Sequence, residues 1–253
     1  MKTEANSRSD YRARIYTNYA SYFQDEAKTF DTQQAVLWGN DYDHYFRGWL
    51  PKSKDAAVVD VGCGSGKLLH YLRQRGYSRI TGVDISPEQT ALARQVSVDV
   101  VECDVVAFLE DHGGTYDLIV GLDIVEHFTK CEVLGFLDAC YAALRPGGRI
   151  ILQTPNAESV FGMKIRYGDF THEVAFDSNS LKRLLCLSGF SNVEWREAGP
   201  VVHGAMSLVR YLIWKVIWTA LAVYSLSETG SIGGGVYTRV FFVTARKDRG
   251  QKE

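Results

Sequence analysis

The 253-residue sequence lacks an excess of charge of either sign, because 28 basic and 30 acidic residues leave a formal net charge of −2. Without a basic surplus no overall field attracts nucleic acid, so we expect no nucleic-acid partner. The five cysteines are odd in number and none form Cys-x-x-Cys, which argues against a disulfide framework and a thiolate zinc site. The first residues lack the apolar core of an export signal. We therefore expect a cytoplasmic chain.

Apolar residues are plentiful, at 46% of the chain, which is enough to bury the core of a single α/β domain over residues 1–253. After Pro51, short β-branched segments alternate with helical patterns, as is typical of a parallel sheet covered by helices. The first predicted strands are Ala57–Val61, Arg79–Val83, Val98–Glu102, Tyr116–Val120 and Arg149–Gln153. The aromatic and charged residues 1–50 are expected to form an N-terminal helical cap over one edge of this sheet.

A glycine-rich turn follows the first predicted strand in the stretch VVDVGCGSG, which contains Gly62, Gly64 and Gly66. Glycine lets a backbone bend sharply and approach a ligand closely. Asp84 ends the second predicted strand and Asp104 follows the third, so both carboxylates are expected at the same edge of the sheet. A carboxylate there can accept hydrogen bonds from ribose hydroxyls or from an adenine amino group. The alternative is that both residues only cap helices.

The ordered motifs VDVGCGSG, GVDIS, ECDV, YDLIVGLDIVEH and LRPGGRIILQTPN resemble those of class I S-adenosylmethionine-dependent methyltransferases. The resemblance implies an α/β, Rossmann-like fold of seven strands, mostly parallel with an antiparallel last strand, and S-adenosylmethionine as cofactor. It places the glycine turn beneath the methionine part, Asp84 at the ribose, Asp104 at the adenine and Asp60 behind the turn. The full predicted cofactor set is Asp60, Gly62, Cys63, Gly64, Gly66, Asp84, Ile85, Asp104, Val105 and Asp123.

Methyl transfer to a hydroxyl needs alignment and a group that removes the proton, so a base is expected beside the cofactor. His127 closes the cluster D-x-x-E-H, formed with Asp123 and Glu126 after the fourth predicted strand. The cluster is similar to the E-x-x-E-H of ubiquinone O-methyltransferases, whose residues can hold a divalent cation. Aspartate at the first position shortens the reach and leaves a metal here uncertain. The alternative is an acidic cluster at a helix N-terminus.

A second candidate base is His172, in the polar stretch RYGDFTHEVAF after the fifth predicted strand. Loops at the carboxyl edge of such a sheet commonly bind acceptors. We predict His172 as the general base, oriented by Asp169 or Glu173. His203 is a further candidate with weaker context, and a passive solvated loop is the alternative reading of the whole stretch.

The last two strands of this fold are predicted at Asn192–Glu197 and Val236–Ala245, so residues 199–235 form a helical insertion between them. Within it, residues 207–226 carry an aromatic stripe containing Trp214 and Trp218, flanked by Arg210 and Lys215. The charges leave an uncharged run too short to span a bilayer. We expect peripheral membrane contact through the aromatic stripe, with the aliphatic face against the enzyme. A buried helix and a homodimer contact are the alternatives.

These patterns together predict a methyltransferase whose acceptor is a hydroxyl on a lipid-linked or membrane-proximal molecule. The stretch GDFTHEVAF is similar to methyltransferases of surface polysaccharide biosynthesis, which makes a sugar of a cell-surface glycan the first choice. A ubiquinone-type phenol is the second choice, and a nitrogen acceptor stays open. A methyltransferase-like scaffold without turnover is the alternative of a different class. The expected location is the cytoplasm, with peripheral contact at the inner face of the membrane.

Overall fold

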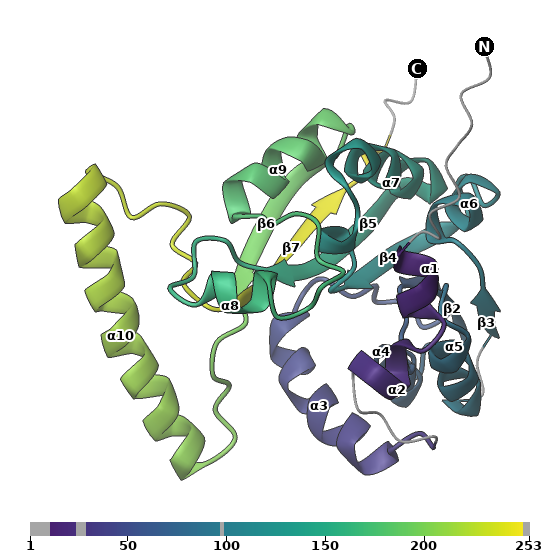
Figure 1. Ribbon diagram of the computed structural model, residues 1–253, viewed down its shortest axis with the longest axis horizontal. Helices are drawn as coiled ribbons and strands as arrows, with labels where there is room; N and C mark the ends of the chain where they lie inside the picture. Colours follow the sequence, from purple (N-terminus) through teal and green to yellow (C-terminus); the bar gives the residue numbers. More distant parts are fainter. Residues whose placement is uncertain (1–10, 24–28, 97–98, 250–253) are drawn as a thin grey trace.

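The computed structural model describes residues 11–23, 29–96 and 99–249, which form an α/β fold around a central sheet (Figure 1). The sheet has seven strands in the order β3-β2-β1-β4-β5-β7-β6. Their bounds are β1 Ala57–Val61, β2 Arg79–Asp84, β3 Asp99–Glu102, β4 Tyr116–Leu122, β5 Leu144–Pro155, β6 Ser191–Glu197 and β7 Val240–Arg246. Strand β7 runs antiparallel to both of its neighbours, and the other pairs are parallel. The predicted fold class is confirmed.

Most predicted strands differ from the structure by a residue or two at an end, and two differ by more. Strand β7 begins at Val240 rather than Val236, because the Asn156 side chain donates to the carbonyls of Val236 and Thr238 and holds this buried segment outside the sheet. Strand β5 is longer than predicted and runs from Leu144 to Pro155. Of the predicted third strand, Val98 lies outside the described residues.

Helices cover both faces of the sheet. Alternating side chains of β1 face opposite sides, so Val58 joins one core and Val59 the other. The first face is covered by α3 Thr32–Tyr45, α4 Lys67–Gln74 and α5 Pro87–Ala93, and the second by α6 Val105–Glu110, α7 Lys130–Ala143 and α9 Ser178–Leu187. The remaining helices are α1 Tyr11–Tyr16, α2 Tyr19–Phe23, α8 Gly162–Arg166, α10 Ala205–Thr229 and the 3₁₀ turns η1 Arg94–Val96 and η2 Val125–His127.

Local capping fixes where the helices near the carboxyl edge of the sheet begin. The Ser86 side chain accepts a hydrogen bond from the Gln89 amide, and Pro87 occupies the first turn of α5. Thr129 and Glu132 form a capping box at the start of α7. These caps terminate the loops after β2 and β4, which therefore stay short and hold their side chains at the sheet edge.

Helix α10 stands beside the domain, and the chain returns to the domain at both of its ends (Figure 1). Its predicted orientation was wrong, because the aromatic stripe faces the protein and the aliphatic face points outward. The Trp218 indole donates to the Gly235 carbonyl at 3.1 Å and its ring lies 5.8 Å from that of Tyr237. Burying an indole removes a large apolar area and gives its N–H a partner, which favours this orientation. The outward side chains are half or more exposed at Val209, Leu212, Ile213, Val216 and Val223.

Among the described residues, α10 is the one helix long and apolar enough to cross a membrane, judged by length and composition alone. The inference that Arg210 and Lys215 leave too short a run was therefore too strict. The segment after the helix folds back along it, since Ser225 Oγ donates to the Ser231 carbonyl at 2.8 Å and Trp218 contacts Gly235. The chain before α10 is held to α3 by His203 and Asp41 at 2.7 Å, and the chain after it by Asn156, so both ends of α10 are tied to the same domain.

Candidate active site

The glycine turn joins β1 to α4 and is fixed to the neighbouring strand by its backbone. The amides of Gly62 and Cys63 donate to the Val83 carbonyl at 2.8 and 3.0 Å. Gly62 has a φ of +70°, and a Cβ there would lie 2.8 Å from the Ile124 side chain. Only glycine combines this backbone conformation with so close an approach. The turn therefore exposes backbone atoms to the space above the sheet edge.

Asp84 supports this turn from the end of β2. Its Oδ2 accepts from the Gly64 amide at 2.9 Å and its Oδ1 from the Ser86 amide at 2.8 Å, while burial raises its pKa. The N-cap of the following helix, α5, is Ser86 and not Asp84. The alternative that Asp84 only caps a helix is therefore wrong. A carboxylate has about four acceptor positions, which leaves room for ribose hydroxyls.

Asp104 behaves differently from Asp84. It is exposed, and it caps α6 by accepting from the Ala107 amide at 3.0 Å. The side chain that follows it, Val105, lines the cleft, whereas Asp104 does not. The capping alternative therefore describes Asp104, and its expected adenine contact stays a prediction.

The glycine turn forms one wall of a cleft of about 560 Å³ at the carboxyl edge of the sheet. Asp60 is fully buried behind the turn, and burial together with nearby Asp84 raises its pKa. Burial also raises the pKa of the Cys63 thiol. The predicted cofactor residues that line the cleft are Asp60, Gly62, Cys63, Gly64, Asp84, Ile85, Val105 and Asp123, and Gly66 stands behind them as the N-cap of α4.

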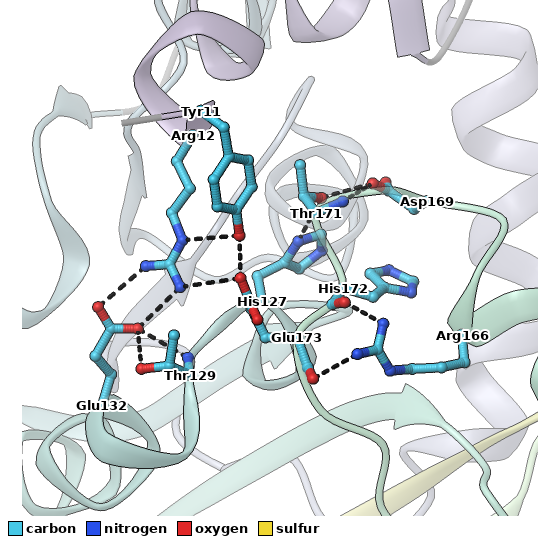
Figure 2. Close-up of polar contacts among 10 residues, drawn as sticks. All are labelled: Tyr11, Arg12, His127, Thr129, Glu132, Arg166, Asp169, Thr171, His172 and Glu173. Atoms are coloured by element: carbon cyan, nitrogen blue, oxygen red, sulfur yellow. Dashed lines mark hydrogen bonds and ion pairs between the residues drawn. The ribbon is translucent and has the colours of Figure 1, made fainter. Parts of the chain in front are cut away.

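The opposite wall brings His127 and His172 together, with ring centroids 4.8 Å apart (Figure 2). His127 ends η2 after β4, and His172 lies in the loop between α8 and α9. The guanidinium of Arg166 donates to the carbonyls of His172 and Glu173 and so fixes this loop. Burial lowers the pKa of both imidazoles, that of His127 to about 4, so both are neutral at physiological pH.

Hydrogen bonds set the tautomer of each imidazole. Thr171 Oγ1 lies 2.6 Å from Asp169 Oδ1 and 2.8 Å from His127 Nδ1. Because the ionised carboxylate can only accept, the hydroxyl donates to Asp169 and accepts from His127 Nδ1–H. His172 Nδ1 lies 3.1 Å from the Ile165 carbonyl, which also only accepts. Both Nε2 atoms therefore carry a free lone pair.

Glu126 lies beside these two lone pairs. It is fully buried, and its Oε2 accepts from Thr154 Oγ1 at 2.9 Å. Within the described part of the chain Glu126 Oε1 has no hydrogen-bond partner, and it lies 4.0 Å from His172 Nε2. Burial and nearby Asp123 raise the pKa of Glu126 well above its usual range. An orphaned buried oxygen of this kind calls for a proton or a cation.

The ligand atoms of Glu126, His127 and His172 lie within 4.8 Å of one another, so this trio fits a divalent cation. The trio expected from the sequence, Asp123, Glu126 and His127, differs from this one in a single member, since His172 stands where Asp123 was expected. Asp123 Oδ2 instead accepts from Gln153 Nε2 at 2.6 Å, and the residue adopts a φ of +52°. The Asp123 side chain is exposed toward the cleft, but the protein around it removes water from its other sides. This desolvation raises the pKa of Asp123 to about 6.

The predicted orienting residues have other partners in the structure. Asp169 reaches His127 through Thr171, and neither Asp169 nor Glu173 orients the His172 ring. Glu173 accepts from Tyr11 and lies 3.8 Å from Arg12. His203 is exposed and pairs with Asp41 at 2.7 Å, outside the cleft.

The first two helices hold the histidine loop, a contact that the sequence did not reveal. Tyr19 OH donates to Asp169 Oδ2 at 2.6 Å, and the ring lines the cleft. Arg12 binds both oxygens of Glu132 at 3.0 Å (Figure 2). Helices α1 and α2 thus lie over the cleft and contribute to the hydrogen-bond network around the histidines.

The comparison with protein families decides the identity of this site. Residues 38–195 match the family model described as "Methyltransferase domain". The chain belongs to this methyltransferase family. This agrees with the S-adenosylmethionine-dependent methyltransferase that the motifs predicted, and the match covers the lining of the cleft except Tyr16, Tyr19 and Val240.

Known proteins resemble this methyltransferase in part of its sequence and in its fold. Ubiquinone biosynthesis O-methyltransferases of Pseudomonas paraeruginosa and Xanthomonas campestris are 33% and 32% identical over 105 and 107 residues, or 39% and 40% of this chain. The chain spans 44% of the length of each. An S-adenosylmethionine-dependent methyltransferase from Archaeoglobus fulgidus aligns with a TM-score of 0.62 at 19% identity, covering 92% of this chain and 99% of that one.

A further solved structure contains the cofactor itself. Phosphoethanolamine N-methyltransferase 2 of Haemonchus contortus, in complex with S-adenosyl-L-methionine, aligns with a TM-score of 0.63 at 17% identity. The alignment covers 92% of this chain and 60% of that chain. At this identity the likeness concerns the fold, and the acceptor has to be argued from the cleft of this methyltransferase.

Proposed function

We propose that this methyltransferase transfers the methyl group to a hydroxyl of a lipid-linked acceptor, with a sugar of a cell-surface glycan as the first candidate. The observation that carries the proposal is the pair of neutral imidazoles in the cleft, whose Nε2 atoms both hold a free lone pair. An alcohol is a poor nucleophile while it keeps its proton, so a nearby base that removes the proton assists the transfer.

His127 is the better candidate for that base. The chain from Asp169 through Thr171 to His127 Nδ1 orients the ring and stabilises the imidazolium that forms when Nε2 accepts the proton. His172 lacks such a carboxylate-linked partner, since its Nδ1 faces a backbone carbonyl. The polar side chains of Asp123, Glu126 and Asp169 in the same cleft suit the several hydroxyls of a sugar.

The same wall supports a metal-assisted version of this function. Glu126, His127 and His172 would hold a divalent cation, and the bonds to both Nδ1 atoms would orient the two imidazoles as ligands. A bound cation would polarise the acceptor oxygen and ease the loss of its proton. Dialysis against a chelator separates the two versions: full activity afterwards supports the metal-free base.

The outward face of α10 supports a membrane-proximal acceptor. The segments before and after the helix are both held to one domain, which suits a helix lying in the membrane interface rather than crossing it. The test is co-sedimentation with anionic liposomes of the whole chain and of an Ile213→Asp/Val216→Asp variant. The matched control is Leu187→Asp, which changes a leucine on α9 that is as exposed as Val216. Equal pelleting of all three would contradict the membrane contact, and dimer loss without a change in pelleting would indicate a subunit contact instead.

The acceptor is tested by transfer of labelled methyl groups from S-adenosylmethionine into a lipid extract, before and after glycan digestion. Label that moves to the released sugars supports the glycan. Label that stays in the lipid fraction as a phenol ether supports the second candidate, a quinone precursor, the class of acceptor suggested by the names of the ubiquinone relatives. Tight cofactor binding with no incorporation into any fraction would support a scaffold without turnover.

A further inference from the structure

A second cavity, of about 680 Å³, lies between α10 and the domain. It is outside the methyl-transfer cleft, but Val240 at the start of β7 lines both. Residues 159–161, which follow β5, also line it, together with the segment that connects β6 to α10. Helix α10 stands beside the domain (Figure 1), and the shared lining residue Val240 makes this cavity a neighbour of the cleft.

Most of the walls of this cavity are apolar. Trp214, Ile217 and Leu221 contribute from α10, and Val160 and Phe161 from the domain. The volume falls in the range of pockets that enclose small ligands. Such walls favour an alkyl or isoprenoid chain over a polar molecule.

The charged side chains that line the cavity are two arginines and one carboxylate. Arg210 and Arg239 both line it, and neither forms an ion pair with a carboxylate of the described chain. The carboxylate that does line the cavity, Asp41, is already paired with His203 at 2.7 Å. Two cations without carboxylate partners beside apolar walls are complementary to an anion that carries an apolar chain.

The indole of Trp214 gives an independent indication of a ligand. Its Nε1 is buried and has no acceptor within the described residues. The indoles of Trp49, Trp195 and Trp218 all donate, to Glu194, Gly234 and Gly235 respectively. Buried indole N–H groups usually find a partner, so the exception marks a place where an acceptor atom is missing.

We propose that this cavity binds an apolar chain that ends in a phosphate, and that this chain is the lipid part of the acceptor. In a lipid-linked acceptor this phosphate joins the chain to the rest of the molecule, so it carries one negative charge as a diester or two as a diphosphate, and either is complementary to Arg210 and Arg239. Because Val240 lines both the cavity and the cleft, an acceptor whose chain occupies the cavity can extend its remainder toward His127 and His172 in the cleft. The inference rests on the lipid-linked acceptor of the proposed function and adds the site that recognises the lipid.

The test is calorimetric titration of the whole protein with dodecyl phosphate below its micellar concentration. We expect saturable one-site binding, with dodecanol and inorganic phosphate each binding at least about tenfold more weakly. An Arg210→Gln/Arg239→Gln variant should lose about tenfold or more in affinity. The matched control Lys215→Gln removes a charge from the same helix but not from the cavity lining, and should bind like the parent.

Several results would overturn the proposal. Undiminished binding by Arg210→Gln/Arg239→Gln would show that the arginines do not hold the phosphate. If inorganic phosphate bound as tightly as dodecyl phosphate, the apolar chain would contribute nothing to recognition. If S-adenosylhomocysteine competed with dodecyl phosphate, the binding site would be the methyl-transfer cleft and not this cavity. Because the titration involves no methyl transfer, a failure here leaves the proposed function standing. Intact binding with no methyl transfer into lipids would contradict the proposed function and the role of the chain as part of the acceptor, while the binding site itself would stand.

Discussion

The two walls of the cleft are built from different material. The glycine wall, residues 60–66 and 84–86, is mostly backbone, and its shape follows from two neighbouring strands. The histidine wall, residues 123–127 and 165–173 with α1 and α2 over it, is made of side chains from segments far apart in the sequence. A backbone cradle suits a cofactor that many enzymes share, whereas a side-chain network can be adapted to one acceptor. Variants on the two walls should therefore affect cofactor binding and turnover separately.

The largest effect is expected from His127→Ala. Removing the proposed base should lower kcat by about 10²- to 10⁴-fold. The affinity for S-adenosylhomocysteine should stay within about twofold of the parent, because the substitution lies on the other wall. Steady-state kinetics with the identified acceptor and cofactor titration give the two numbers. A His172→Ala variant with the greater loss would return the role of base to His172.

The next effect is on the opposite wall. Asp84→Ala removes a carboxylate that holds the Gly64 and Ser86 amides, and should weaken S-adenosylhomocysteine binding by about tenfold to a hundredfold. Asp104→Ala is the matched control, because Asp104 caps α6 and lies outside the cleft lining. Calorimetric titration measures both, and thermal melting shows whether each variant stays folded. If both variants lost the same affinity for S-adenosylhomocysteine, the predicted contact between Asp104 and the adenine would be supported instead.

The difference between the backbone-built glycine wall and the side-chain-built histidine wall explains which parts of the site could be predicted from the sequence. The turn with Gly62 and the carboxylate of Asp84 follow from contiguous motifs, because strand ends in a parallel sheet must meet at one edge. Thr171 gave no signal, since its role depends on Asp169 and His127 meeting in space. The periodicity of α10 predicted its two faces correctly, but a single helix cannot show which face the domain covers.

A smaller effect is expected from Thr171→Val, which breaks the link between Asp169 and His127. We expect kcat to fall by about three- to tenfold through loss of a single hydrogen bond, with little change in cofactor affinity. Thr171→Ser keeps the hydroxyl and should restore most of the activity. The pH profile of kcat separates a positioning role from a merely structural one, because the link also stabilises the protonated imidazole. Identical profiles for parent and Thr171→Val would remove the link from the mechanism.

The smallest effect concerns the attachment of α1. The hydrogen bonds from Arg12 lower the pKa of Glu132 to about 2 from an ordinary value of 4.5. A carboxyl group whose folded pKa is depressed contributes stability above its unfolded pKa, and this contribution disappears as the pH falls from about 4.5 toward 2. Because the Glu132 side chain is 45% exposed, Glu132→Gln should cost at most about 1 kcal/mol near neutral pH. Thermal melts of parent and variant should converge as the pH is lowered through this window. The exposed Glu110→Gln on α6 is the control: it removes a surface charge outside the Arg12–Glu132 pair and should follow the parent throughout.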